Sequence, residues 1–271
     1  MKNLLSVDIE DWFHFIGSRY SPRIDQWDDY ESRMEPAVES LLGALWPHKA
    51  TFFCLGWAAE KHPGVIRRIA EAGHEIASHG YYHELVFELG PDRFREDITR
   101  TKALLESVAG VAVTAYRAPG FSIRPQDGWA FDIIFETGHR VDSSVFPGIR
   151  TMGGIPDASP YPGPLRTSHG DLFEIPVSTA SFLGQRTAFC GGGFFRFIPY
   201  VIMAREIRRL NARGIPAVMY IHPRDLDPDQ PRLKLEPVNS FMYHFGLRRA
   251  PAKFGRLMRE FEWDAFSSAA P

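Results

Sequence analysis

The sequence has little cysteine, no long apolar run and almost no excess of charge of one sign. Its 271 residues include only two cysteines, Cys54 and Cys190, without a C-x-x-C spacing, which argues against a disulfide framework or a zinc knuckle and indicates reduced thiols. The 31 basic residues nearly balance the 33 acidic ones, and no Lys/Arg block stands out. The charge therefore gives no argument for nucleic acid or an anionic membrane surface, and we expect a small or neutral partner.

We also expect no targeting or membrane-spanning segment. Residues 1–7 form an apolar, strand-like segment that reaches Asp8 with no room for the apolar core and cleavage site of a signal peptide. No stretch approaches the roughly 18 apolar residues of a membrane span. We therefore expect a cytoplasmic enzyme, with peripheral membrane association and homo-oligomerisation left open.

Short apolar runs rich in β-branched or aromatic residues alternate with amphipathic segments of helical length. The strand-like runs are Leu4–Ile9, Ala50–Leu55, Glu75–Ser78, Ala112–Tyr116, Arg140–Ser143, Leu172–Val177 and Ala217–His222. The predicted helices are Glu35–Pro47, Trp57–Ala72, Pro91–Val108, Pro125–Thr137, Pro199–Arg213 and Pro251–Phe261. Prolines suit the first turn of three of them, and glycines follow several as stop signals.

This alternation predicts parallel strands joined by right-handed crossovers. Seven strand-like runs favour a distorted (β/α)7 barrel, an α/β fold with one unit fewer than the full barrel. Residues 146–169, rich in Pro and Gly, predict a long loop over the barrel mouth. We place a catalytic domain at residues 1–225 and a C-terminal extension, packed on the same domain, at 226–271.

Ionisable residues lie where several of these strand-like runs end, which is where an α/β barrel places its chemistry. They are Asp8, Glu10, Asp11, His79, His83, Arg117, Asp142 and His222. His79 and His83 are four residues apart, so on one turn of helix they would share a face and could bind one metal ion.

Several of these motifs, in order, resemble the NodB-homology polysaccharide deacetylases. The matching segments are Ser6–His14, Ala50–Phe53, His74–His83, Tyr116–Phe121, Val141–Ser144 and Tyr220–Pro223. More narrowly, Gly191–Arg196 and Asp227–Arg232 resemble the subgroup found with bacterial exopolysaccharide and exosortase systems. The resemblance implies a distorted barrel, a single divalent metal held by one carboxylate and two histidines, and hydrolysis of an N-acetyl group on a sugar.

The resemblance also implies roles for individual residues. His79 and His83 would bind the metal, and Asp8 would act as the base that takes a proton from water. Arg117 would pair with Asp8 and keep it ionised. His222, from the opposite side of the barrel mouth, would protonate the leaving amine, and Asp142 would hold its imidazole charged.

The third metal ligand stays open between two carboxylates. The family usually carries two adjacent aspartates here, whereas this chain reads Asp8-Ile9-Glu10-Asp11. Strand alternation puts Asp8 and Glu10 on one face and favours Glu10, but a turn directly after Asp8 would let Asp11 reach the metal.

We therefore expect a metal-dependent hydrolase that removes acetyl groups from an N-acetylated sugar of a bacterial exopolysaccharide or its lipid-linked precursor. Zinc is the expected ion, with cobalt, nickel and manganese as alternatives, because a His₂-carboxylate site binds several divalent ions. One alternative function is an allantoinase-like hydrolase of another C–N bond, such as that of a cyclic amide or ureide. Another is a carbohydrate-binding protein that has lost catalysis.

Overall fold

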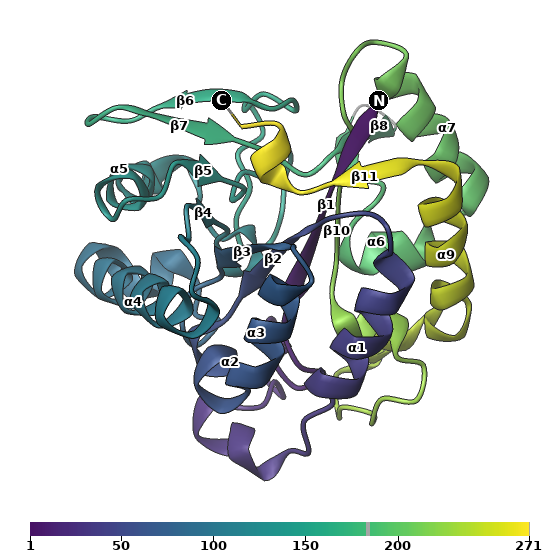
Figure 1. Cartoon of the computed structure of the whole chain (residues 1–271), viewed down its shortest axis with the longest axis horizontal. Coiled ribbons are helices and arrows are strands. Elements are labelled where there is room, and N and C mark those ends of the chain that lie inside the picture. Colours follow the sequence, from purple (N-terminus) through teal and green to yellow (C-terminus); the bar gives the residue numbers. More distant parts are fainter. Residues whose placement is uncertain (183–184, 271) are drawn as a thin grey trace.

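Seven parallel strands form the centre of the computed structural model, which describes residues 1–182 and 185–270. Along the sheet they run in the order β10-β1-β2-β3-β4-β5-β7 (Figure 1). The strands are β1 (Lys2–Ile9), β2 (Thr51–Cys54), β3 (Glu75–Ser78), β4 (Ala115–Tyr116), β5 (Val141–Asp142), β7 (Asp171–Glu174) and β10 (Val218–Ile221). All seven expected strands are present, and the predicted barrel-like α/β fold is confirmed.

The sheet curls without closing into a complete barrel. Within the described part of the chain, β7 and β10, the two ends of the parallel run, do not pair as strands. Ser178, four residues beyond β7, donates its backbone N–H to the carbonyl of Val218 in β10 (3.1 Å). Gly191 also forms an isolated parallel bridge with Tyr220 of β10, so irregular segments occupy the place where a full barrel would have another strand.

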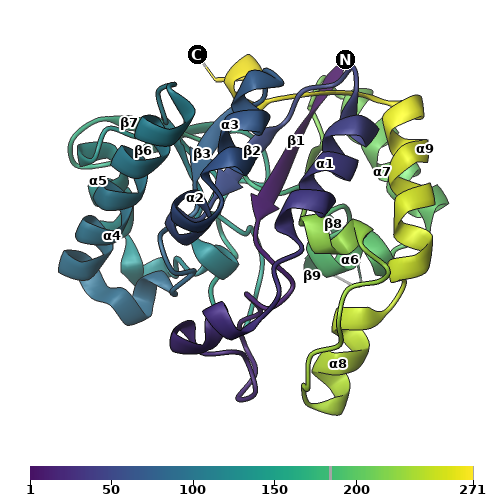
Figure 2. The ribbon, with the colours of Figure 1, turned by 60° about the horizontal axis from the view of Figure 1, so that its bottom comes forward.

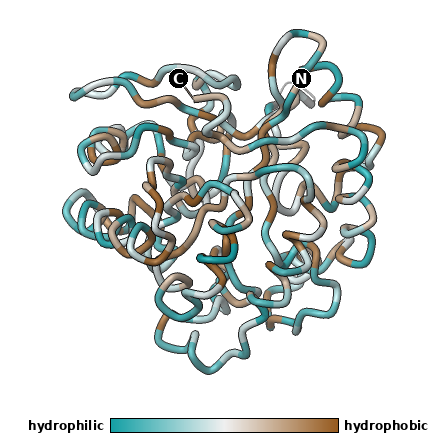
Figure 3. The backbone as a smooth tube through the Cα atoms, viewed as in Figure 1, coloured by the Kyte–Doolittle hydropathy of each residue, from teal (hydrophilic) through white to brown (hydrophobic). Residues whose placement is uncertain are grey.

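Helices cover the outside of the curled sheet (Figures 1 and 2). They are α1 (Met34–Leu45), α2 (Gly56–Lys61), α3 (Pro63–Glu71), α4 (Val86–Ala109), α5 (Trp129–Glu136), α6 (Gly192–Phe197), α7 (Tyr200–Asn211), α8 (Pro237–His244) and α9 (Ala250–Glu260). Each of the longer helices buries one apolar face; α3, for example, buries Val65, Ile66 and Ile69. Figure 3 shows the inner strands mainly hydrophobic and the outer loops mainly hydrophilic.

Three helix predictions differ from the structure in their bounds. The helix expected over Pro125–Thr137 is a 3-10 turn at Pro125–Asp127 followed by α5 from Trp129. The helix expected over residues 57–72 is divided into α2 and α3, because Pro63 begins a new helix after the extended His62. α4 begins at Val86, before the expected start at Pro91, but it consists of two helical pieces. Gly90, with φ 70°, is not helical, so the second piece begins at Pro91 as the sequence predicted. A glycine adopts that left-handed conformation without a steric penalty.

The loop expected over residues 146–169 is partly a strand. Its second half contains β6 (Gly163–Arg166), which pairs antiparallel with β7 and extends the sheet by one edge strand. A separate hairpin of β8 (Thr179–Phe182) and β9 (Gln185–Ala188) follows. Short polar strands at an edge bury too little apolar surface to give a clear sequence pattern.

The end of the chain adds a further strand beside β1. Residues of β11 (Glu262–Asp264) pair in parallel with Lys2–Leu4. Since β10 pairs with Leu4 on one edge of β1, β11 lies on the other, which β2 occupies from Ser6 onward. Trp263 is buried in the main core. Within the described residues, no helix combines the length and apolarity that crossing a membrane requires.

Candidate active site and metal centre

The ionisable residues expected at the strand ends lie together at the carboxyl edge of the sheet. A cavity of about 150 Å³ is lined by Asp8, Glu10, His79, His83 and His222, among others. These residues come from the ends of β1, β3 and β10, which lie within the run β10-β1-β2-β3 of the sheet. The same edge carries the catalytic groups of closed (β/α) barrels.

Glu10, His79 and His83 form a compact set of metal-ligand atoms. Glu10 Oε1 lies 3.4 Å from His79 Nε2 and 3.1 Å from His83 Nε2. The Nδ1 atoms of His79 and His83 bond the carbonyls of Arg117 (2.8 Å) and His14 (3.0 Å). With Nδ1 bonded to a carbonyl, each ring directs Nε2 at Glu10. That nitrogen donates to the Glu10 carboxylate while the ring is charged, and its lone pair is free to bind a metal when the ring is neutral.

Glu10 is held in its charged form although it is buried. Burial alone would raise its pKa, but the imidazoles of His83 and His222 and hydrogen bonds from His79 and His83 lower the pKa of Glu10 well below its usual value. Two imidazole nitrogens and one ionised carboxylate fit a divalent ion and leave coordination positions open.

The two histidines meet through a turn and not on a helix, which corrects the expected geometry. His79 follows β3 directly, and its backbone N–H bonds the carbonyl of Cys54 (3.0 Å). Gly80 and His83 then adopt positive φ values of 73° and 57°. Reversal of the chain at these two positions turns His83 back toward His79. A left-handed histidine costs free energy and is typical of a functional site.

Asp11 lies outside this group. Its carboxylate accepts hydrogen bonds from the backbone N–H groups of Trp12 (2.9 Å) and Arg33 (3.1 Å) and from the Ser32 hydroxyl (2.5 Å). It thus ties the end of β1 to the start of α1. The chain turns at Ile9, since the Glu10 N–H bonds the Asp8 carbonyl (3.0 Å). Of the two carboxylates that the sequence left open as the third ligand, Glu10 is the one that faces His79 and His83.

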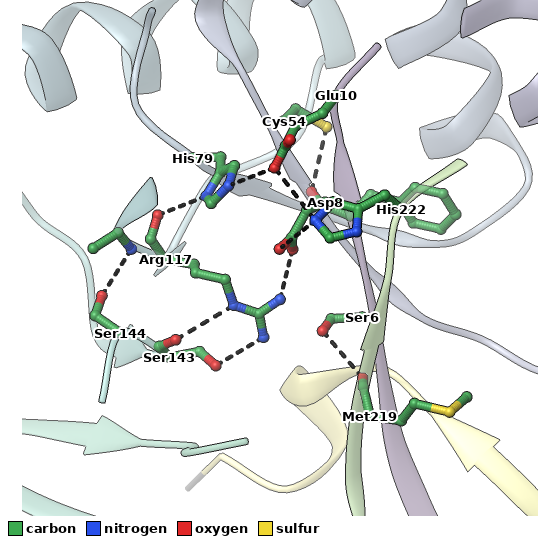
Figure 4. A network of polar contacts seen from close by, with 12 residues as sticks. Ser6, Asp8, Glu10, Cys54, His79, Arg117, Ser143, Ser144, Met219 and His222 are labelled. Atoms are coloured by element: carbon green, nitrogen blue, oxygen red, sulfur yellow. Dashed lines mark hydrogen bonds and ion pairs between the residues drawn. The ribbon is translucent and has the colours of Figure 1, made fainter. Parts of the chain in front are cut away.

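Asp8 contacts Arg117 as expected (Figure 4). The Arg117 Nη1 donates to Asp8 Oδ1 over 2.6 Å, and both side chains are buried. The rest of the guanidinium is held by Ser143, through its carbonyl (3.3 Å) and its hydroxyl (2.9 Å), and lies over the Phe53 ring. A charge-assisted contact of this length fixes the Asp8 carboxylate in orientation.

His222 lies beside Asp8 and Glu10, and not on the opposite side of the mouth as the sequence suggested. Its Nε2 is 3.9 Å from Asp8 Oδ2 and 3.5 Å from Glu10 Oε1. The reason is topological: β10, the last strand of the parallel run, pairs directly with β1, and Ile221 is opposite Val7.

The carboxylate that holds His222 is Asp225, which corrects the expectation for Asp142. The Nδ1 of His222 donates to Asp225 Oδ2 over 2.9 Å. Asp142 lies in β5, with four strands between it and β10, and accepts from the hydroxyl (2.7 Å) and N–H (3.0 Å) of Ser144. The Asp142 carboxylate is therefore engaged by Ser144, and the hydrogen-bond partner of the His222 Nδ1 is Asp225.

Behind Asp225 lies a buried arginine, Arg196, which the sequence analysis named only as part of the segment Gly191–Arg196 and not as a site residue. Arg196 Nε is 3.0 Å from Asp225 Oδ1. Burial would raise the pKa of Asp225, but Arg196 and the hydrogen bond from His222 lower it. The sequence signal that could have identified Asp225 is His222-Pro223-Arg224-Asp225. Pro223 and Asp225 suit the first and third positions of a short helix, and the Asp225 carboxylate accepts from the backbone N–H of the N-cap residue, His222.

Other walls of the cavity come from residues to which the sequence analysis assigned no role. Arg150 and Met152 enter from the long loop, and burial lowers the pKa of His14, in another wall, to about 3. Gly191 makes room for an aromatic wall, because a Cβ there would lie 2.0 Å from the Tyr220 ring. The glycine at the start of the segment Gly191–Arg196 thus has a packing reason.

Comparisons with known proteins agree with this arrangement. Residues 26–126 match the polysaccharide deacetylase family model, and residues 143–270 match a domain of unknown function, DUF3473. A peptidoglycan-N-acetylglucosamine deacetylase of Bacillus cereus is 41% identical over 83 residues, which are 30% of this chain and 30% of that protein. The chain covers under a third of the length of the first curated relatives it matches.

Among solved structures, a putative polysaccharide deacetylase from Mycobacterium smegmatis superposes with a TM-score of 0.63 and 25% identity, over 99% of this chain and 89% of that one. A mutant of a CE4 family pseudoenzyme shares the fold alone (TM-score 0.50, 13% identity, 98% and 67% covered). The chain is thus similar to polysaccharide deacetylases over residues 26–126 and to DUF3473 over residues 143–270.

Proposed function

We propose that this protein is a metal-dependent deacetylase that removes N-acetyl groups from an N-acetylated sugar of a bacterial exopolysaccharide or of its lipid-linked precursor, on the cytoplasmic side. One observation carries the proposal: Glu10, His79 and His83 form a ligand set on the same cavity as Asp8 and His222. The Bacillus cereus relative is named for deacetylation of N-acetylglucosamine in peptidoglycan, which supports an N-acetylated sugar as substrate.

The side chains have complementary tasks in amide hydrolysis. A divalent ion held by Glu10, His79 and His83 would supply Lewis-acid polarisation of the amide carbonyl and of a water molecule. Asp8, oriented by Arg117, accepts the proton of the attacking water. His222, whose Nδ1 proton is held by Asp225, gives a proton from Nε2 to the departing amine.

Two variants test the ligand set, and each replaces one carboxylate by the amide of the same length. We expect Glu10→Gln to lose bound metal at trace divalent-ion concentrations, because it removes one of three ligands. Asp11→Asn is the matched control: it should keep the metal and lower the melting temperature, since Asp11 ties β1 to α1. Elemental analysis of both proteins beside wild type measures the difference. Loss of metal from Asp11→Asn alone would assign the ligand to Asp11.

The reaction is tested by acetate release from N-acetylated oligosaccharides. We expect Asp8→Asn to keep its metal while turnover falls by about 10²- to 10⁴-fold, the usual contribution of a general base. Metal binding without acetate release by the wild type would favour the carbohydrate-binding alternative. Hydrolysis of a cyclic amide or ureide in place of the acetylated sugar would favour the allantoinase-like one.

A further inference from the structure

Helix α8 presents a row of exposed apolar side chains. Val238, Phe241, Met242 and Phe245 are 73%, 58%, 43% and 40% exposed. Their spacing of three, one and three residues puts them on one face of the helix and the residue that follows it. Tyr243, on the opposite face, is buried. Figure 2 shows α8 projecting from the body of the molecule.

A basic cavity of about 780 Å³ adjoins this apolar row, and Phe245 lines both. Its cationic lining residues are Arg196, Arg232, Arg248, Arg249 and Lys253. None of the described residues that line it is acidic.

The cations of the cavity divide into two groups. Arg196 faces inward to Asp225, and Lys253 donates to the carbonyls of Phe195 and Ile198. Arg232, Arg248 and Arg249 are exposed, and none forms an ion pair with another described residue. Three arginines are therefore available to an anionic partner.

Both features lie toward the end of the molecule at which the candidate active site opens. Helix α6 begins at Gly192 and Gly193, which line the catalytic cavity, and reaches Arg196 and Phe197, which line the basic one. In Figure 2, β1 points toward the end of the molecule where α8 projects. A surface bound by α8 would thus lie near the mouth of the site.

We propose that α8 and the basic cavity dock this protein on a bilayer that contains anionic lipid. The four apolar side chains enter the boundary between headgroups and acyl chains, and Arg232, Arg248 and Arg249 pair with lipid phosphates. An interfacial helix combines an apolar face with nearby cations in this way, and its attraction depends on anionic lipid. The apolar row stands on a projecting helix and is flanked by cations, which matches a bilayer in both shape and charge.

Flotation with vesicles tests the docking. We expect the wild type to float with phosphatidylcholine vesicles that contain phosphatidylglycerol, and to float much less with phosphatidylcholine alone or at high salt. Arg248→Glu/Arg249→Glu should weaken binding by more than about tenfold, since each cation at an anionic surface contributes about fivefold. Phe241→Ser/Met242→Ser should weaken it by about tenfold or more.

Matched variants separate the patch from the rest of the surface. Trp46→Ser removes an aromatic that is 82% exposed at the end of α1, and Arg67→Glu/Arg68→Glu makes the same charge change on α3. Both should bind like wild type, and circular dichroism should show every variant folded. Equal losses in the controls, equal binding to neutral vesicles, or no binding would overturn the proposal. A different result would also overturn it: a wild type that does not bind vesicles but forms a dimer in size-exclusion chromatography, which Phe241→Ser/Met242→Ser abolishes. A second copy of the chain would then be the partner that covers α8.

Discussion

At the scale of single residues, His222 is held by a buried network of a hydrogen bond and an ion pair. Asp225 accepts from its Nδ1, and Arg196 holds Asp225 from behind while donating to the carbonyls of Met242 and Phe245. Those carbonyls lie at the end of α8. The contact that orients the proposed acid is therefore also a contact to the proposed docking helix, which links the two sites through one guanidinium.

The hydrogen bond from His222 to Asp225 predicts the effect of Asp225→Asn. An asparagine can present its amide to Nδ1 in either orientation and no longer fixes the imidazole tautomer or stabilises the imidazolium. We expect turnover to fall by about 10²- to 10⁴-fold, the range of a general acid, with metal content unchanged. Asp142→Asn is the control, because Asp142 does not reach His222; if it lost as much turnover in its folded form, Asp225 would not be the orienting group.

At the scale of elements, two buried carboxyl groups face each other across neighbouring strands. Asp142 in β5 is directly opposite Glu174 in β7. Burial, and then the charge of Asp142, raise the pKa of Glu174 well above its usual value, and burial raises that of Asp142. Like charges in register destabilise a strand pair unless one is protonated. The raised pKa of Glu174 therefore favours its protonated form beside Asp142.

This pair predicts a pH dependence of stability. Above its unfolded pKa, near 4.3, Glu174 loses its proton more readily in the unfolded chain than in the folded protein. Its contribution to the free energy of unfolding therefore falls as the pH rises from that value through the raised folded pKa. Glu174→Gln should raise the melting temperature more at pH 8 than at pH 5, measured by thermal denaturation. The exposed control Glu71→Gln should show no such difference, and an unchanged pH slope in Glu174→Gln would refute the raised pKa of Glu174.

At the scale of the whole molecule, the site draws on three parts of the chain. The polysaccharide deacetylase match supplies His79, His83 and Arg117, while the DUF3473 match supplies His222. Asp8 and Glu10 precede both. Strand β11 pairs with the start of β1, the strand that positions these carboxylates, so the C-terminal residues support the site from its far end.

This organisation predicts that residues 226–271 unfold together with the rest of the chain. Trp263 is only 2% exposed and packs in the main core. Trp263→Ala should lower the free energy of unfolding by about 3 to 5 kcal/mol, the usual cost of deleting a large buried side chain. Urea denaturation should give one transition in wild type and variant alike, with Trp46→Ala as the exposed control. Two separate transitions would instead define the extension as an independent unit.

The sequence by itself determined the local features. Apolar runs bounded by Gly and Pro marked the seven parallel strands, and polar residues after Ile9, Ser78, Tyr116 and Ile221 marked the edge that carries the site. These signals are short-range, because they depend on backbone preference and on burial of each strand.

Only the tertiary structure decided which side chains meet. Pairing of β10 with β1 brought His222 beside Asp8 and separated it from Asp142, and the turn at Gly80 and His83 joined the two histidines without a helix. A nearly neutral chain also gathers Arg232, Arg248 and Arg249 around one cavity. Composition averages charge over the chain, whereas strand order and loop conformation set the distances at which charges act.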